Sequence, residues 1–324
     1  MNQNFWSALP RPFFVLAPLA DVTDAAFRRV IANYGKPHAL WTEFTSAEAL
    51  CDVHHESLGC NLLYSEAERP IVAQLWSANP AAMEQAAALV ARLDFDGIDI
   101  NMGCPDRRVE RRGAGAALCQ QPVLAQALIR AAQCGAGALP VSVKIRLGYD
   151  RDELDTWLPA LLEMQPAAIT IHARTRQEKS DVPAHWDAVA RAVHIRQAHG
   201  SSTLLIGNGD VRTIAEARAR AAATGVDGVM LGRAIFGNPW LFHPLTTRDA
   251  LPATERLRVL VEHTQLFETL LGDIKSMDRM KKHYKAYLAG LGTGTETLLP
   301  QLMASHSAAE VAAIVERILL HDTA

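Results

Sequence analysis

Short apolar runs recur eight times through the first three quarters of the chain, and a helix-like stretch separates each run from the next. The runs span residues 13–17, 39–43, 71–76, 97–101, 141–145, 168–172, 204–207 and 228–231. Near-continuous apolar strands that alternate with helices indicate a parallel sheet, because parallel strands need long crossovers and helices supply them. Eight such units in about 240 residues have the size of a (β/α)8 barrel, so we predict an α/β fold of this type.

The intervening helices have start and stop signals of their own. Asn79 followed by Pro80 is typical of an N-cap and a first helical residue. Thr213 with Glu216 three residues later predicts a capping box, and Gly225 supplies a C-terminal stop. Both predicted helices lead directly into predicted strands.

The strand pattern stops after the eighth run, and the chain from about Pro252 onward indicates helices only. One apolar stripe lies within 257–271, and another within 311–319 follows the capping residues Ser307 and Glu310. We therefore predict two domains, a catalytic barrel over residues 1–245 and a small all-helical domain over residues 246–324.

Composition limits the possible partners and compartments. The 324 residues carry 32 Lys and Arg against 35 Asp and Glu, a net charge of −3, which excludes a wholly basic protein that coats nucleic acid. None of the five cysteines forms a CxxC pair, so we expect reduced thiols and no metal site. Residues 1–12 lack a signal-peptide pattern and no run of about 18 apolar residues occurs, so we expect a cytoplasmic protein without a membrane segment.

Polar side chains and glycines gather at the predicted carboxyl ends of the strands, where active sites of (β/α)8 barrels lie. In chain order these positions hold Ala17, Pro18, Leu19, Glu43, Gln74, Asn101, Cys104, Lys144, Arg146, His172, Arg174, Asn208, Gly209, Asp210, Gly232 and Arg233. Gly209 and Gly232 follow the last two strands, where backbone N–H groups can approach a phosphate, and Arg233 adds further donors. A glycine after a strand can also be a simple turn.

Lys144 and His172 end adjacent predicted strands and could both face one ligand. A fixed lysine would stabilise the negative charge of a reduced flavin, although most lysines are solvated or ion-paired. Cys104 lies in a Gly-Cys-Pro turn at the barrel mouth, and a thiol with a usual pKa of about 8.5 suits a general acid. The cysteines at positions 51, 119 and 134 have no such setting, and we expect them to be small buried apolar residues.

A local basic cluster occurs in the C-terminal part of the chain, within eleven residues. It comprises Lys275, Arg279, Lys281, Lys282 and Lys285. On a continuous helix the first, second and fourth of these would share one face. Such a run is usually a solvated surface, but in an acidic chain it is also a candidate contact for a phosphate backbone.

Seven segments together resemble one known family, the flavin-dependent tRNA-dihydrouridine synthases. They are 17–20 (APLA) with 22–24 (VTD), 101–105 (NMGCP), 112–118 (RGAGAAL), 144–148 (KIRLG), 172–175 (HART), 208–210 (NGD) and 232–233 (GR). The resemblance covers the whole predicted barrel in order, and the helical C-terminal part is similar in kind.

The resemblance implies a bound FMN that NADPH reduces, and a uridine of tRNA, in the D-loop, whose 5,6 double bond receives hydride at C6. It places Ala17, Pro18, Leu19, Gln74, Lys144, His172, Asn208, Gly209, Asp210, Gly232 and Arg233 around FMN. Cys104 would protonate C5, while Asn101, Arg146, Arg174, Arg279 and Lys282 would contact the RNA substrate. No GxGxxG follows the first strand, so the nicotinamide would visit the flavin site in turn, and a large RNA favours a monomer with a free barrel mouth.

Three alternatives remain open from the residues. Another FMN-dependent barrel oxidoreductase that acts on a small ring would not need the basic helical part, and it would not retain tRNA. A Schiff-base aldolase that uses Lys144 would be colourless and would be trapped by borohydride with a carbonyl substrate. An RNA-binding protein on a barrel that has lost its activity would not need the set Cys104, Lys144 and His172.

Overall fold

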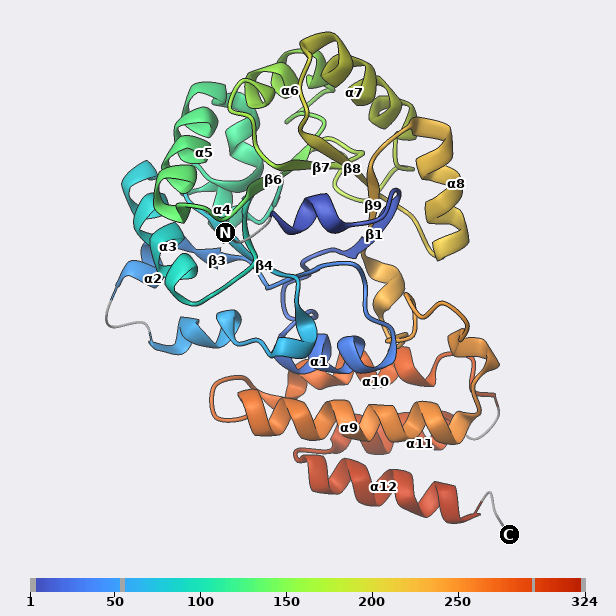
Figure 1. Cartoon of the computed structure of the whole chain (residues 1–324). Helices are drawn as coiled ribbons and strands as arrows, with labels where there is room; N and C mark the ends of the chain where they lie inside the picture. The colour runs from blue at the N-terminus through green and yellow to red at the C-terminus, as the bar shows by residue number, and fades with distance from the viewer. Residues whose placement is uncertain (1–3, 53–55, 293–294, 322–324) are drawn as a thin grey trace.

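The computed structural model describes residues 4–52, 56–292 and 295–321. Eight parallel strands form a nearly closed barrel surrounded by helices, which confirms the predicted α/β class (Figure 1). The barrel strands are β1 (Phe13–Leu16), β2 (Leu40–Trp41), β4 (Ile71–Trp76), β5 (Gly97–Met102), β6 (Val141–Arg146), β7 (Ala168–His172), β8 (Leu204–Asn208) and β9 (Gly228–Leu231). A short β3 (Thr45–Ser46), which the sequence did not predict, pairs with the end of β4.

Helices follow the strands and then form the C-terminal part. The α-helices are α1 (Ala25–Tyr34), α2 (Ala47–Cys51), α3 (Pro80–Arg92), α4 (Arg107–Glu110), α5 (Pro122–Ala136), α6 (Leu154–Leu162), α7 (Trp186–His199), α8 (Ile214–Thr224), α9 (Ala253–Leu271), α10 (Lys281–Leu288), α11 (Thr295–Ala304) and α12 (Ala308–His321). The 3-10 helices are η1 (Phe5–Ala8), η2 (Glu56–Leu62), η3 (Glu66–Glu68), η4 (Gly115–Gln120), η5 (Arg233–Ile235), η6 (Arg248–Ala250) and η7 (Met277–Met280). No helix in these described ranges is long and apolar enough to cross a membrane.

The predicted helix signals are confirmed with one change. The Asn79 side chain accepts from the first N–H groups of α3, and Gly225 ends α8 in the left-handed region at φ +74°. Thr213 accepts from the N–H of Glu216 at 3.0 Å, but the Glu216 carboxylate accepts from the N–H of Arg212 instead of that of Thr213. The capping residues nevertheless start the helix at the predicted place.

The strands pair in the order β1-β9-β8-β7-β6-β5-β4-β2. At the seam between β1 and β2, His38 replaces the missing strand pairing. Its backbone N–H donates to the carbonyl of Phe14 at 3.0 Å, and its ring Nδ1 accepts from the N–H of Phe14 at 3.0 Å. His38 therefore links β1 to the segment before β2 by two hydrogen bonds, at the place where these two strands do not pair.

Side chains alternate along each strand, so every second residue points into the barrel. Trp6 of η1 closes the amino-terminal end of the barrel, with ring centroids 5.6 Å from Phe13 and 6.0 Å from Trp41. Apolar residues of the strands fill the space above these rings. The polar inward positions therefore lie toward the opposite, carboxyl end.

The helices α9 to α12 form a layer beneath the barrel, and α9 and α10 pack next to α1 (Figure 1). The Tyr34 hydroxyl at the end of α1 donates to Glu262 of α9 at 2.5 Å. The basic cluster does not lie on one helix, so the predicted shared face is wrong. Lys275 precedes η7, Arg279 lies within η7, and only Lys281 and the residues after it belong to α10.

Two histidines are fully buried where the barrel meets this layer. The ring of His263 on α9 stacks on Phe27 of α1 at 4.7 Å, and His283 of α10 lies 4.7 Å from His263. No ring nitrogen of the pair has a hydrogen-bond partner among the described residues. Burial lowers the pKa of His263 well below its usual value and that of His283 to about 3, so both rings are neutral at physiological pH.

Candidate active site

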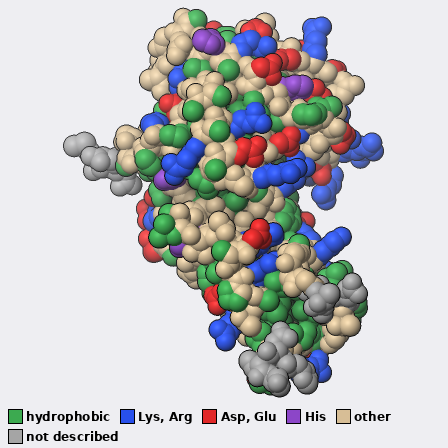
Figure 2. All heavy atoms as spheres, turned by 90° about the vertical axis from the view of Figure 1, so that its right-hand side faces the viewer, with side chains coloured by type: hydrophobic (Ala, Val, Ile, Leu, Met, Phe, Trp, Pro, Cys, Tyr) green, Lys and Arg blue, Asp and Glu red, His purple; other side chains and the backbone are tan. Residues whose placement is uncertain are grey.

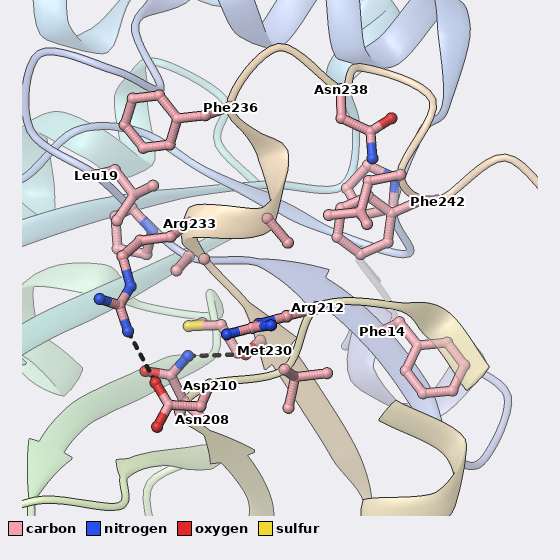
Figure 3. A pocket seen from close by; sticks show the side chains of 18 of the residues that line it. Phe14, Leu19, Asn208, Asp210, Arg212, Met230, Arg233, Phe236, Asn238 and Phe242 are labelled. Atoms are coloured by element: carbon pink, nitrogen blue, oxygen red, sulfur yellow. Dashed lines mark hydrogen bonds and ion pairs between the residues drawn. The ribbon is translucent and has the colours of Figure 1, made fainter. Parts of the chain in front are cut away.

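A cavity of about 1950 Å³ opens at the carboxyl ends of the barrel strands (Figure 3). Most of the predicted site residues line it, although they come from six different strands or the loops after them. These are Ala17, Pro18, Leu19, Asn101, Cys104, Lys144, Arg146, His172, Arg174, Asn208, Gly209, Asp210, Gly232 and Arg233. Gln74, Arg279 and Lys282 do not line the cavity.

Gln74 lies below the cavity floor and is fully buried. Its Nε2 donates to Asp99 at 2.7 Å, and its Oε1 accepts from the side chain of Asn101 at 3.0 Å. Burial raises the pKa of Asp99 to about 6. Gln74 therefore belongs to a buried hydrogen-bonded group with Asp99 and Asn101, and its predicted contact with a ligand stays a prediction.

The Asn101 side chain shapes the turn that carries Cys104. Its Oδ1 accepts from the N–H groups of Gly103 at 3.1 Å and Cys104 at 2.9 Å. Gly115, at φ +62°, closes on this turn so tightly that a Cβ there would lie 2.7 Å from the carbonyl oxygen of Cys104. Burial raises the pKa of the half-buried Cys104 thiol, so the thiol faces the cavity in its protonated form at neutral pH.

Lys144 lies deeper than the sequence suggested. The strand register places it opposite Asn101 and Thr170, whereas His172 lies opposite Arg146 and Asn208. The Lys144 Nζ reaches Asn208 Oδ1 at 3.4 Å and makes no ion pair with any carboxylate in the described part of the chain. Burial and the nearby positive charge of Arg146 lower the pKa of Lys144 to about 8. Lys144 therefore faces the cavity without a direct ion pair, although the charge of the nearby Asp99 acts on it, and it can meet an anionic ligand.

His172 is neutral in this setting. Burial and the positive charge of Lys144 lower its pKa well below the usual value. Its Nε2 lies 3.4 Å from the Arg174 guanidinium, which can only donate, so this nitrogen accepts. The other ring nitrogen is then the one that carries the proton.

The guanidinium groups of the two buried arginines at the barrel mouth donate most of their hydrogen bonds to other groups of the protein. Arg146 donates to the carbonyls of Gly103 at 2.8 Å, Thr175 at 2.9 Å and Lys179 at 2.9 Å. Arg174 donates to a loop carbonyl of Val182 at 2.6 Å. Both therefore tie loops together, and only a part of each guanidinium remains for a ligand.

Asp210 links the last two strand ends (Figure 3). It pairs with the buried Arg174 and accepts from the exposed Arg233 at 2.8 Å, while these cations hold its pKa below its usual value. Gly209 adopts φ +140°, and a Cβ there would lie 2.7 Å from the side chain of Ala184. At Gly232 an added Cβ would meet only Ala17, at 3.7 Å, so no protein atom requires glycine there. The space next to Gly232 is therefore open to a ligand.

Comparison with known proteins identifies this arrangement. A family model described as dihydrouridine synthase (Dus) matches residues 15–321. The chain belongs to the dihydrouridine synthase family.

Relatives from two bacteria resemble this dihydrouridine synthase over nearly their full length. A Staphylococcus aureus (strain COL) protein named "Probable tRNA-dihydrouridine synthase" is 40% identical over 321 residues, which cover 98% of this chain and 96% of the relative. A Bacillus subtilis (strain 168) protein named "Probable tRNA-dihydrouridine synthase 2" is 40% identical over 319 residues, covering 98% and 97%.

Solved structures of other proteins share the fold of this dihydrouridine synthase. Histamine dehydrogenase from Rhizobium sp. 4-9 matches with a TM-score of 0.54 and 13% identity, over 78% of this chain and 48% of that one. Morphinone reductase in complex with tetrahydroNAD matches with a TM-score of 0.51 and 16% identity, over 72% and 86%. At these identities the likeness concerns the barrel alone.

Two residues of the basic cluster form ion pairs with carboxylates of this dihydrouridine synthase itself, which the sequence did not predict. Lys275 pairs with Glu43 at 2.7 Å, and Arg279 pairs with Asp21. The second oxygen of Glu43 accepts from the N–H of Asp21 at 2.5 Å. These contacts fasten the loop after β1, which carries Leu19, to the C-terminal helices. Lys282 makes no ion pair with a described carboxylate.

The remaining cysteines only partly match the expectation. Cys119 is buried, but Cys51 and Cys134 are exposed, so the prediction that they are buried apolar residues is wrong for these two. Both lie on helices whose exposed positions tolerate a small side chain. Within the described residues, no group of three His, Cys, Asp or Glu side chains gathers as a metal site would require.

Proposed function

We propose that this dihydrouridine synthase is an FMN- and NADPH-dependent enzyme that reduces the 5,6 double bond of a D-loop uridine in tRNA. The observation that carries the proposal is one cavity that presents a protonated thiol, Cys104, and an unpaired cation, Lys144. The family membership and the names of the relatives support the reaction and the RNA substrate.

The cavity residues fit FMN. Lys144, Asn208 and the neutral His172 form a donor and acceptor set that suits the polar edge of a flavin ring, and Ala17, Pro18 and Leu19 would contact its apolar part. The space beside Gly232, together with Gly209 and the Arg233 guanidinium that Asp210 fixes, suits the phosphate. Gln74 would support the flavin site by holding the side chain of Asn101, which donates a hydrogen bond to it. When bound, FMN that NADPH has reduced supplies the hydride for C6 of uracil.

The protein supplies the proton. Cys104 donates it to C5, and Asn101 holds the turn that carries the thiol. The base must leave its stack to enter such a cavity. The free parts of Arg146 and Arg174 would contact the uridine or its phosphate, since both guanidinium groups line the cavity.

The remaining chain would hold the rest of the tRNA. We propose residues 1–245 as the catalytic domain and 246–324 as a helical tRNA-binding domain, in which Lys282 and Lys285 contact phosphates directly. Arg279 would contact a phosphate with the part of its guanidinium that its ion pair with Asp21 leaves free. We further propose a cytoplasmic monomer, because a large RNA needs an uncovered barrel mouth.

The visible absorption spectrum of the freshly purified protein tests the cofactor, before and after NADPH is added without air. We expect two flavin bands that NADPH bleaches, followed by formation of dihydrouridine in tRNA that lacks it. A protein that stays colourless after incubation with FMN would contradict the proposal. A flavin that bleaches without any tRNA product would favour an oxidoreductase that acts on a small ring.

Lys144→Met should weaken FMN binding and remove its pH dependence. In the natural protein the apparent Kd for FMN should rise as the pH increases through about 8, because the ammonium group of Lys144 is present below its pKa and lost above it. Loss of a charge-assisted contact costs about 1.5–3 kcal/mol, roughly a 10–150-fold increase in Kd at pH 7. Fluorescence titration of the apoprotein from pH 6.5 to 9 measures both effects. Lys281→Met is the matched control, since Lys281 pairs with Asp278 on the surface of the C-terminal helices. An unchanged pH profile in Lys144→Met would exclude the assigned role.

A further inference from the structure

The cavity continues past the phosphate position into an outer lobe that no proposed role uses. We define the outer lobe by Phe14 of β1, Lys36, Arg212 and Arg218 at the start of α8, and Trp240 and Phe242 after η5. Figure 3 shows Phe14 and Phe242 on the side of the pocket away from Leu19 and Arg233, with Arg212 between the two sides.

The barrel architecture explains why the outer lobe exists. The other barrel strands are covered by helices that run back along the barrel wall, but β9 is followed only by the 3-10 helices η5 and η6 before the chain enters α9. The outer side of β1 at the buried Phe14 therefore borders the cavity between α8 and the segment that holds Trp240 and Phe242. A groove with aromatic walls remains where the last barrel helix would pack.

The cations of the outer lobe make no direct ion pair among the described residues, although the charges of Asp96 and Glu68 act on Lys36. Lys36, Arg212 and Arg218 are exposed, and none of them pairs with a carboxylate in the parts of the chain that the structure describes. The cations around the phosphate position differ, because Arg174 and Arg233 share Asp210. The Arg218 guanidinium lies over the Phe14 ring at 5.4 Å, which fixes it at the rim. Figure 2 faces the α8 side of the molecule, where Lys and Arg side chains lie on the barrel surface among Asp and Glu side chains.

The cavity is large enough to hold more than the flavin and the target base. Pockets for small ligands enclose roughly 300–1,000 Å³, whereas this cavity measures about 1950 Å³. Unpaired cations beside aromatic rings are the features that bind a nucleotide strand, since the cations attract phosphates and a base can stack on a ring. The three cations come from the segment before α8, from α8 itself and from the segment before β2. Three cations from separate segments suit a strand with several phosphates better than a single phosphate group.

We propose that the outer lobe binds a further part of the tRNA backbone, with Lys36, Arg212 and Arg218 on phosphates and Phe242 against a base. This assignment rests on the proposed tRNA substrate. It makes the barrel wall, in addition to the C-terminal helices, a determinant of how the RNA lies across the enzyme.

The test compares tRNA binding by the holoenzyme and by an Arg212→Ala, Arg218→Ala double variant over 50–300 mM salt. Each lost phosphate contact should reduce the slope of log K against log salt by about 0.9, so the double variant should lose about 1.8. At about 0.1 M salt this corresponds to a roughly 60-fold weaker affinity for both contacts together. Lys36→Ala should reduce the slope by about 0.9 from a separate element, so a local defect in α8 cannot explain both results. Arg220→Ala is the matched control, because Arg220 lies on the same helix, outside the lobe, and pairs with Glu216 at 3.7 Å.

The outcomes separate this proposal from the proposed function. If the natural enzyme reduces tRNA and both variants keep its affinity and salt slope, the outer lobe proposal is wrong while the function stands. If the double variant instead needs more NADPH for half-maximal flavin reduction and binds tRNA normally, the lobe holds the dinucleotide, which also overturns the proposal. If the natural enzyme neither binds nor reduces tRNA, the proposed function itself fails.

Discussion

We expect Cys104→Ala to lower the rate of uridine reduction by roughly 10²–10⁴-fold, the usual contribution of a positioned general acid. The thiol faces the cavity, and burial raises its pKa, so it holds its proton at neutral pH. The variant should still bind FMN and bleach with NADPH, because no flavin contact is assigned to this side chain. Single-turnover formation of dihydrouridine, measured beside the flavin spectrum, separates the two steps.

The exposed Cys134 supplies the control for this prediction. Cys134→Ala changes the same side chain on the outer surface of α5 and should keep the full rate. The natural enzyme should also stay active up to alkaline pH, because a thiol with a raised pKa loses its proton only above its usual range. Full uridine reduction by Cys104→Ala would show that another group, or water, donates the proton.

The buried pair of histidines should make the protein sensitive to acid. Both rings have a native pKa below the unfolded value, so the unfolded state binds more protons as the pH falls below about 6.5. Their contribution to stability is therefore complete above that pH and is lost on acidification. Each histidine should remove about 1.4 kcal/mol from the free energy of unfolding for each pH unit, or about 5.6 kcal/mol for the pair over two units.

The measurement is the pH dependence of unfolding by urea between pH 7 and pH 4.5. Asp24 and Asp99, whose pKa values burial raises to about 6, act in the opposite direction, so variants must be compared with the natural protein. His263→Phe should reduce the acid-induced loss by about 1.4 kcal/mol per pH unit. His194→Asn, at an exposed position of α7, should leave it unchanged. Equal slopes for all three proteins would mean that the rings are protonated in the native state.

The barrel and most of its mouth could be predicted from the sequence because both depend on local patterns. Apolar runs with helical separations specify a parallel barrel, and in any such barrel the strand ends converge, whatever the details of packing. The residues after the strands, from Pro18 to Arg233, were therefore found without coordinates. The resemblance then assigned chemistry to Cys104 and Lys144, which no pattern of polarity can do alone.

Other features depended on contacts between segments far apart in the chain. The sequence placed Gln74 at the barrel mouth, and only the fold shows that its side chain is engaged by Asp99 and Asn101. It placed Arg279 on an RNA-binding helix face, but Asp21 lies across from it in the fold. Burial decides the charge state of Lys144 and His172, and burial is a property of the assembled barrel.

By itself, the sequence determined the fold class, the family and the set of strand-end residues, since hydrophobic periodicity and motif spacing are local and survive any packing. Only the tertiary structure decided which charges are paired. Glu43 and Asp21 pair with two members of the basic cluster, whereas Lys36, Arg212 and Arg218 make no direct ion pair among the described residues, and Arg218 lies over the Phe14 ring. An ion pair depends on distances of a few ångströms between side chains from different elements, and those distances exist only after the chain has folded.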